Sequence, residues 1–274
     1  MEITLTGTGS PLPDPNRAGP STLVKADETR ILVDAGRGVV MRLAGASTMP
    51  NQLSGVLITH LHSDHICALG DVITTHWIMS QGIATLPIHG PKGTAQYVSR
   101  VLDSLEPDIG YRISHHDLLR NGPMVEVTEH DGGDHFSIGD VQIECARTEH
   151  APVAPTLGYR LAHRGVVAAL VGDTIPCEGL AKLVESADVY VQTVIRDDIV
   201  RNIPSAMLQD ILDYHSTVSQ AGQTAAAGGV RTLVLTHMVP PPTPDQYDEW
   251  RAIAAKHFDG EVVIGDDLTT INAD

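Results

Sequence analysis

The chain has few cysteines and no long apolar run. Cys67, Cys145 and Cys177 are odd in number and widely spaced, which argues against a disulfide framework and makes the cytoplasm the expected location. No window approaches the roughly 18 uninterrupted apolar residues of a membrane span. The first residues, Met1–Gly7, lack the basic and apolar regions of a secretory signal. We therefore expect a protein without disulfides that does not cross a membrane.

Basic residues are also scarce. The sequence has 18 lysines and arginines against 34 aspartates and glutamates, a formal net charge of −16 at pH 7. Proteins bind the phosphate backbone of nucleic acids through clustered lysines and arginines, and here the longest basic cluster is no more than a pair. The composition therefore makes nucleic acid an unlikely partner.

Apolar residues make up 42% of the 274 residues, which is ample for a buried core. Periodicity predicts strands in two runs, each interleaved with helices, at 3–8, 21–26, 29–34, 55–59, 86–89, 124–129, 134–138, 141–147, 156–162, 166–171, 189–194, 232–235 and 262–264. The expected helices are 36–44, 66–79, 93–105, 178–186, 216–228 and 244–257. We expect 124–129, 134–138 and 141–147 to be consecutive antiparallel strands. With no linker between the runs, the pattern predicts one domain over 1–274, an α/β (α+β) four-layer αββα sandwich.

The strongest local signal follows the expected strand 55–59. The pattern His60-x-His62-x-Asp64-His65 places three imidazoles and a carboxylate within six positions. Such a cluster is costly to hold in a core unless a cation satisfies it. Mixed histidine and aspartate ligands suit Zn²⁺ first, with Mn or Fe as alternatives. The pattern predicts metal-assisted hydrolysis.

Three further ligand-type residues stand where expected strands end. His150 follows the strand 141–147, Asp173 follows 166–171, and His237 follows 232–235. Functional loops commonly lie at strand ends, so we expect these side chains to complete a two-metal site.

This set of residues resembles the metallo-β-lactamase superfamily in its hydrolase form, and its motifs occur in the family's order. The resemblance covers essentially the whole chain and implies the metallo-β-lactamase fold. It is narrowed to the ribonuclease Z and arylsulfatase-like branch by Gly7-Thr8-Gly9-Ser10-Pro11, Asp34-Ala35-Gly36, Gly172-Asp173-Thr174-Ile175-Pro176-Cys177-Glu178 and His215-Ser216-Thr217.

The resemblance also implies roles for these residues. His60, His62 and His150 would hold one zinc ion, Asp64, His65 and His237 the other, and Asp173 would bridge them. Asp34 would orient the ligand loop through hydrogen bonds. A metal-bridged hydroxide would be the nucleophile. Asp64, Asp173 and His215 are the expected catalytic residues, with His215 as proton donor or stabiliser of the transition state.

Two departures from the ribonuclease Z pattern bear on the substrate. Only 22 residues separate His150 from Asp173, which leaves no room for the long arm with which similar tRNA-processing enzymes grip tRNA. Thr193 stands where those enzymes have a glutamate that steadies the catalytic histidine. Leu12, Val153, Met238 and Val239 are expected to give the pocket an apolar lining. We therefore expect hydrolysis of a small-molecule ester, whether a sulfate, phosphodiester, carboxylester or lactone, as in arylsulfatase-like and phosphodiesterase-like relatives.

Several alternatives remain open at this point. The chain could be a tRNA 3′-processing endonuclease, or a metal-containing binding or regulatory protein with little turnover. The resemblance makes a homodimer possible. His76 and Trp77 could line the pocket, although core packing is the ordinary explanation. The histidines at 115, 116, 130 and 135 could form a second metal site, but a solvated loop accounts for them more simply.

Overall fold

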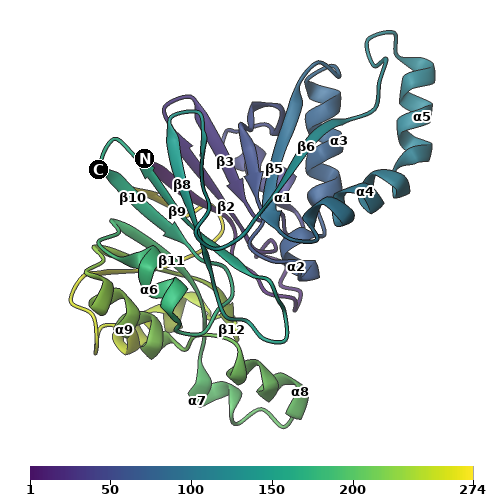
Figure 1. Ribbon diagram of the computed structural model, residues 1–274. Helices are drawn as coiled ribbons and strands as arrows, with labels where there is room; N and C mark the ends of the chain where they lie inside the picture. Colours follow the sequence, from purple (N-terminus) through teal and green to yellow (C-terminus); the bar gives the residue numbers. More distant parts are fainter. Residues whose placement is uncertain (274) are drawn as a thin grey trace.

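The computed structural model describes residues 1–273, and two seven-stranded sheets form its centre (Figure 1). The first sheet has the order β14-β1-β2-β3-β4-β5-β6. Its strands are β1 (Glu2–Gly7), β2 (Ser21–Ala26), β3 (Thr29–Val33), β4 (Gly55–Leu57), β5 (Thr85–Pro91), β6 (Met124–His130) and β14 (Thr270–Asn272). The second sheet has the order β13-β12-β11-β10-β9-β8-β7. Its strands are β7 (His135–Ile138), β8 (Val141–Arg147), β9 (Leu157–His163), β10 (Val166–Leu170), β11 (Val189–Ile195), β12 (Thr232–Val239) and β13 (Glu261–Ile264).

Helices cover the outer face of each sheet. On the first sheet these are α1 (Val39–Gly45), α3 (Leu69–Met79) and α4 (Thr94–Ser104), and on the second α6 (Glu178–Val184), α9 (Val218–Gly228) and α10 (Tyr247–Ala254). The remaining helical segments are α2 (Ser63–Ile66), α5 (Glu106–His115), α7 (Asp197–Val200), α8 (Ala206–Gln209) and the 3₁₀ turns Pro50–Gln52, Asp210–Asp213 and Pro244–Gln246.

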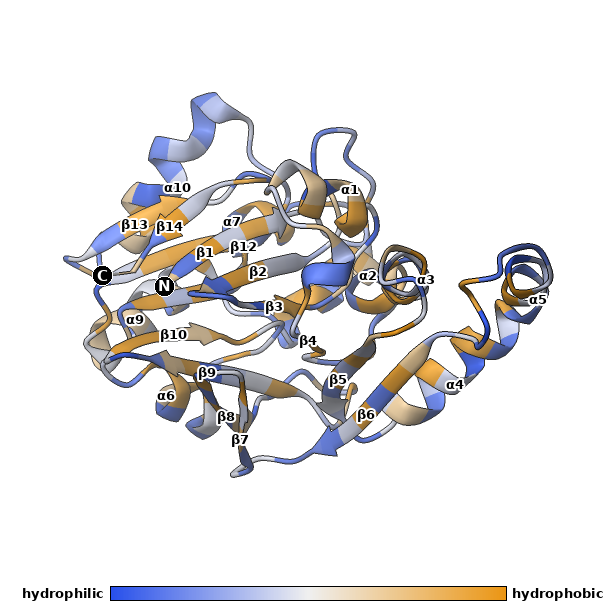
Figure 2. Ribbon diagram, turned by 90° about the horizontal axis from the view of Figure 1, so that it is seen from above, coloured by the Kyte–Doolittle hydropathy of each residue, from blue (hydrophilic) through white to orange (hydrophobic). Residues whose placement is uncertain are grey.

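Three apolar clusters hold the layers together. The central cluster lies between the sheets, where Ile3 and Leu5 of β1 meet Tyr159 and Leu161 of β9, all fully buried. Alternate residues of these strands point to the same face, and apolar positions follow the strands of both sheets in Figure 2. The other two clusters join each sheet to its helices. The four-layer αββα prediction is confirmed.

Strand direction gathers the loops of both sheets at one edge. In the first sheet β3, β4, β5 and β6 are parallel neighbours, and in the second β10, β11, β12 and β13 are parallel neighbours. Parallel strands carry their carboxyl ends to a common edge of the sheet. The predicted metal ligands lie in the loops that follow β4, β8 and β10 and, for His237, near the end of β12, so this edge is called the site edge.

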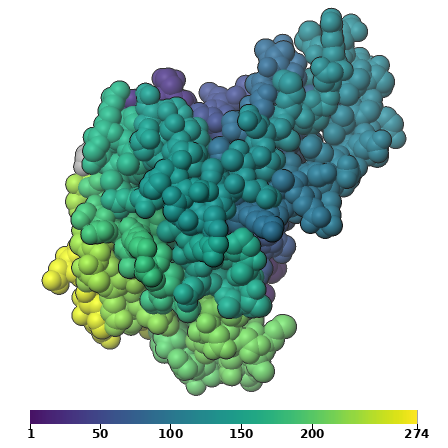
Figure 3. Space-filling view, in the orientation of Figure 1, coloured from purple at the N-terminus to yellow at the C-terminus, as the bar shows by residue number. Residues whose placement is uncertain are grey.

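Two segments project from this body. One is the arm formed by α4 and α5, and the other is the lobe 196–215, which contains α7 and α8 (Figures 1 and 3). No residue of α5 is buried, so this helix adds no side chain to the buried core. Both α5 and the helical turns of the lobe were absent from the sequence prediction.

Two strand predictions were wrong. The segment 124–129 was expected to pair antiparallel with the next two strands, but β6 pairs in parallel with β5 and belongs to the other sheet. The series was also expected to end at 262–264. It ends instead with β14, which pairs antiparallel with β1 and is too short to show a periodic pattern. The prediction of a single domain stays a prediction. Within residues 1–273, no helix is both long and apolar enough to cross a membrane.

Candidate metal centre

The loop from His60 to His65, here called the ligand loop, is tied to both sheets at its start. Ile58 N donates a hydrogen bond to His89 O of β5 at 2.8 Å, and Leu157 N of the second sheet donates to Thr59 O at 2.9 Å. The buried Tyr159 hydroxyl donates to Ile58 O at 2.6 Å. Such bonds leave the backbone little freedom, so the imidazoles that follow start from a fixed point.

Asp34 fixes the ligand loop from the side of β3. Its Oδ1 accepts from Thr59 N at 2.8 Å, and its Oδ2 accepts from Thr59 Oγ1 and from His65 Nδ1, each at 2.8 Å. Asp34 lies at φ 61°, a left-handed conformation that aspartate tolerates better than most residues. Because Nδ1 of His65 is bound to Asp34, its Nε2 is the atom free for a ligand, as predicted for an orienting carboxylate.

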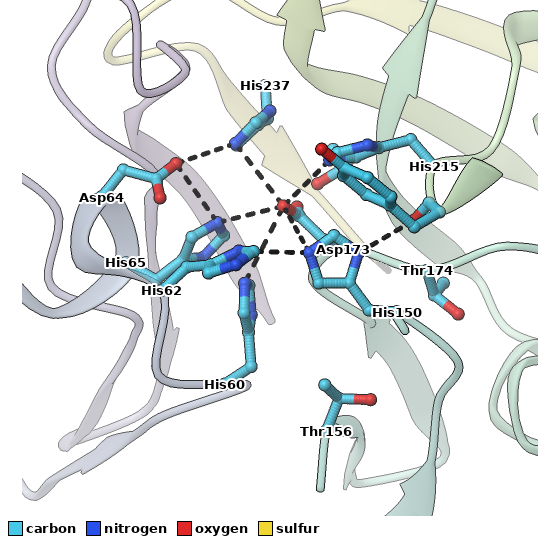
Figure 4. Close-up of polar contacts among 12 residues, drawn as sticks. His60, His62, Asp64, His65, His150, Thr156, Asp173, Thr174, His215 and His237 are labelled. Carbon is cyan, nitrogen blue, oxygen red and sulfur yellow. Dashed lines mark hydrogen bonds and ion pairs between the residues drawn. The ribbon is translucent and has the colours of Figure 1, made fainter. Parts of the chain in front are cut away.

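The structure brings all seven predicted ligands together in two groups (Figure 4). One group is His60, His62, His150 and Asp173, and the other is Asp64, His65 and His237. Within each group the ligand atoms lie within 4.8 Å of one another, and six of the seven residues are buried, His62 being partly exposed.

Asp173 lies between the two groups. Its Oδ2 is 3.9 Å from His60 Nε2 and 3.8 Å from His150 Nε2 on one side. On the other side it is 3.5 Å from His65 Nε2 and 3.7 Å from His237 Nε2. This is the position that a carboxylate shared by two ions would occupy.

The donor atoms fit divalent metal ions. His60 Nε2, His65 Nε2 and Asp173 Oδ1 are buried and have no hydrogen-bond partner. Leaving such groups unsatisfied costs about 1–3 kcal/mol each, and a bound cation removes that cost. Each group, with Asp173 shared, offers imidazole nitrogens and carboxylate oxygens, the donor set that suits zinc and similar ions.

Electrostatics in the cluster favour ionised carboxylates. Burial opposes the charge on Asp173, but His237 and His65 hold the pKa of its carboxyl well below the usual range. Burial and the neighbouring His65 lower the pKa of His60 well below its ordinary value, and burial lowers the pKa of His150 to about 4. Burial opposes a charge on His65 and His237, but Asp173 and the neighbouring carboxylates outweigh it and raise the pKa of both imidazoles. Ionised aspartate and neutral histidine are the forms that bind metals, so binding at these two histidines would release protons.

His215 stands beside the cluster, as expected of a catalytic residue, although no finding tests that role. Its Nε2 is 3.2 Å from Asp173 Oδ2, and its Nδ1 lies 3.1 Å from the carbonyl oxygen of Ile211. The imidazole is thus oriented by a backbone carbonyl of the lobe. Thr193, expected at the position of that glutamate, is buried in β11.

Two contacts of the site were not predicted from the sequence. The carbonyl oxygen of Tyr214 accepts from His150 Nδ1 at 2.8 Å, and the Tyr214 ring packs edge-on against the same imidazole. Thr59 Oγ1 lies 3.0 Å from His60 Nδ1. A backbone carbonyl leaves no mark in a sequence, and only the position of Thr59 beside His60 could have drawn attention to it.

The predicted apolar lining is wrong in part. Met238 is buried and packs in the cluster between the second sheet and its helices, and Val239 is buried beside it. Leu12 is exposed and Val153 partly exposed, so these two remain available at the rim. Met238 and Val239 belong to β12, which continues past His237, so their side chains point to opposite faces of the second sheet and both are covered there.

The other histidines weighed in the sequence lie away from the cluster. His76 and Trp77 are buried in α3, and Trp77 Nε1 donates to Asn121 O at 2.9 Å, so packing accounts for them. His115 and His116 lie at the end of the arm. Residues 1–273 contain no third group of possible metal ligands, and His130 and His135 form none.

Comparisons with known proteins agree on the family. The model of the Beta-lactamase superfamily domain matches residues 29–238. Ribonuclease Z of Mycolicibacterium paratuberculosis is 51% identical over 276 residues, which covers 100% of this chain and 99% of that protein. Ribonuclease Z of Mycobacterium tuberculosis is 48% identical over 270 residues, covering 98% of this chain and 96% of that protein.

Solved structures show the same fold. The metallo-beta-lactamase fold protein YhfI from Bacillus subtilis has a TM-score of 0.76 at 21% identity, covering 98% of both chains. The short form of human tRNase Z has a TM-score of 0.73 at 22% identity, covering 100% of both chains.

These findings confirm a metal-dependent hydrolase of ester bonds and correct two other predictions. The expected small-molecule ester substrate and the exclusion of nucleic acid are both wrong, because relatives about half identical over their full length are ribonucleases Z. The error lay in the use of net charge, which sums the whole surface and carries no information about one cleft. With the ligand cluster, the fold and the full-length identity in agreement, the chain belongs to the β-lactamase superfamily and, within it, to the ribonuclease Z family.

Proposed function

We propose that this chain is a ribonuclease Z, a metal-dependent endonuclease that cleaves a phosphodiester bond at the 3′ side of precursor tRNA. The observation that carries the proposal is 51% identity to a ribonuclease Z along the entire chain. The short interval between His150 and Asp173 does not oppose it, since relatives of nearly equal length carry the same name.

We propose two zinc ions as the metals. His60, His62 and His150 would hold one ion, Asp64, His65 and His237 the other, and Asp173 would be shared. Bound there, the ions would lower the pKa of a water molecule and stabilise negative charge on the attacking and leaving oxygens. The unsatisfied, buried atoms of His60, His65 and Asp173 support this assignment.

The protein side chains would then position and transfer protons. We propose that His215 donates a proton to the leaving oxygen, or a hydrogen bond to the charge that develops there. Its Nδ1 faces the Ile211 carbonyl, so the other nitrogen, 3.2 Å from Asp173, is the one directed to the cluster. Asp34 would keep His65 oriented through the 2.8 Å contact to Nδ1.

The acidity of the chain is compatible with this function. Asp34, Asp64 and Asp173 bring three carboxylates to the cluster. Two divalent ions would bring four positive charges, which exceed the charge of the three carboxylates where the scissile phosphate binds, until the bound water loses its proton.

The test uses the purified chain loaded with zinc and a precursor tRNA that carries a 3′ trailer. We expect a single cleavage at the trailer, with the product ends mapped by sequencing, and no cleavage after chelation. Asp173→Ala serves as the inactive control. Rapid turnover of an aryl sulfate, lactone or carboxylester with no cleavage of the tRNA would contradict the proposal.

A further inference from the structure

Most basic side chains of this protein are engaged by carboxylates. Within residues 1–273, the lysines and arginines without an ion pair are Arg37, Lys92, Arg100, Arg120, Arg160 and Lys256. A cation that already pairs with a carboxylate must give up that partner before it binds a phosphate, whereas these six need not. Their positions therefore indicate where a polyanion can be held.

Arg37 lies beside the far end of the ligand loop. The preceding Gly36 packs so closely that a Cβ there would come 2.6 Å from Asp64 O, and Ala35 N donates to His65 O at 2.6 Å. Arg37 is half-buried, and its Nη2 donates to the carbonyl oxygens of Ser10 and Leu12 at 2.7 and 3.4 Å. Carbonyl contacts leave the guanidinium charge uncompensated.

Lys92 lies beside the near end of the ligand loop. The next residue, Gly93, has φ 106°, and a Cβ there would come 2.9 Å from Leu61 Cδ1. Since β3 and β5 flank β4 in the sheet, Arg37 and Lys92 stand on opposite sides of the loop that carries His60 to His65. The other four cations are not on loops next to it: Arg100 and Arg120 are on or next to the arm, Arg160 is in β9, and Lys256 follows α10.

The exposed Lys92 also lines a cleft of about 590 Å³ with Thr148, Pro155 and Thr156 of the segment around His150. Of the acids of this cleft, Asp131 is the one whose charge is compensated by a cation, Arg147. Glu129 accepts from Gly93 N and Ala95 N at the start of α4, while Asp131 pairs with Arg147 and Asp134 contacts His130. The ammonium of Lys92 is thus the cleft's unpaired cation among the described residues.

We propose that Arg37 and Lys92 each hold a backbone phosphate of the RNA, on opposite sides of the bond that is cleaved. The proposal rests on the ribonuclease function proposed above and adds the residues that hold the substrate. Both contacts are to phosphate and carry no base specificity.

The experiment measures kcat/KM on precursor tRNA at several salt concentrations for Lys92→Gln and Arg37→Gln. Each variant is expected to lower kcat/KM about tenfold, mainly through KM, and to reduce the slope of log kcat/KM against log salt by about one. Lys92→Arg and Arg37→Lys keep the charge and should keep the slope. Lys256→Gln, an exposed cation beyond α10, is the matched control and should change neither quantity.

A second substrate separates phosphate binding from damage to the centre. Bis(p-nitrophenyl) phosphate has no flanking phosphates, so both variants should hydrolyse it at the wild-type rate. An unchanged salt slope in both variants, or an equal loss on the small diester, would overturn the proposal. If the wild-type protein itself fails to cleave tRNA, the proposed function fails, and that result is distinct from wild-type cleavage with unaffected variants.

Discussion

The metal cluster and helix α5, the outer part of the arm, are opposites in burial. Six of the seven ligand residues are buried, and Asp34, Tyr214 and the second sheet fix their orientation. Helix α5 has no buried residue, and Tyr111 on it is 74% exposed. Where packing and hydrogen bonds determine each side chain, the sequence is constrained and substitution is costly. Where no residue of a helix is buried, the sequence is less constrained and substitution should cost less. The predictions below test that contrast from its largest expected effect to its smallest.

Loss of a ligand should have the largest effect. His60→Ala and Asp173→Ala each remove a proposed metal ligand whose buried side chain has an atom without a hydrogen-bond partner. We expect about 10³-fold or greater loss of hydrolysis together with loss of bound metal. Metal content by mass spectrometry and turnover of bis(p-nitrophenyl) phosphate give the two readouts. Full metal content with full turnover in either variant would contradict the assignment.

His215→Ala should cost less, about 10²-fold in kcat on tRNA, the usual size of a general-acid contribution. Metal content should stay at the wild-type level, because His215 belongs to neither ligand group. Tyr214→Phe is the matched control, since it keeps the carbonyl that accepts from His150 Nδ1. A loss of metal in His215→Ala would mean a structural role instead.

Asp34→Asn should weaken metal binding by about 10–100-fold, the range found when an orienting partner of a ligand is lost. The amide keeps the shape but can no longer accept every bond that Asp34 accepts from Thr59 and His65. Competition with a fluorescent chelator measures the affinity. Excess metal should restore most of the activity, which it cannot do for Asp173→Ala.

His89 should make stability depend on pH. Burial and the neighbouring His130 lower its pKa to about 4 in the folded protein. Below the ordinary pKa of about 6.5 the unfolded chain takes up a proton that the folded protein resists. Stability is therefore lost as the pH falls from about 6.5 to about 4. The urea concentration at the unfolding midpoint should depend less on pH in His89→Asn than in the wild type. The same pH dependence in both proteins would show that His89 is not the cause.

The arm should give the smallest effect. Tyr111→Ser alters a side chain that is largely exposed on a helix without buried residues, so the free energy of unfolding should change by about 0.5 kcal/mol or less. Leu161→Ala, at a fully buried position between the sheets, should cost about 2–5 kcal/mol and serves as the comparison. A large loss in Tyr111→Ser would show that another surface covers the arm.

The same contrast explains what could be predicted from sequence. The seven residues that the structure brings together could be picked out because metal binding demands particular side chains at particular strand ends, as with His60 and Asp173. Helix α5 was missed because it has no buried residue, and the pairing of β6 was missed because tertiary packing decides which sheet a strand joins. The substrate was misjudged because a net charge of −16 sums the whole surface and carries no information about one cleft.

β14 forms one edge of the first sheet, and its position determines where tags and new chain ends can be placed. β14 pairs with β1, and the amino group of Met1 donates to Ala273 O at 2.9 Å, so both ends of the chain lie together (Figure 1). Met1 and Ala273 lie at the start of β1, at the edge of the sheet opposite the site edge. Tags on either terminus should therefore leave the site edge accessible. A short loop joining the termini should allow new chain ends to be made in the exposed arm. Removal of β14 would instead bare an unpaired edge of β1, which invites aggregation.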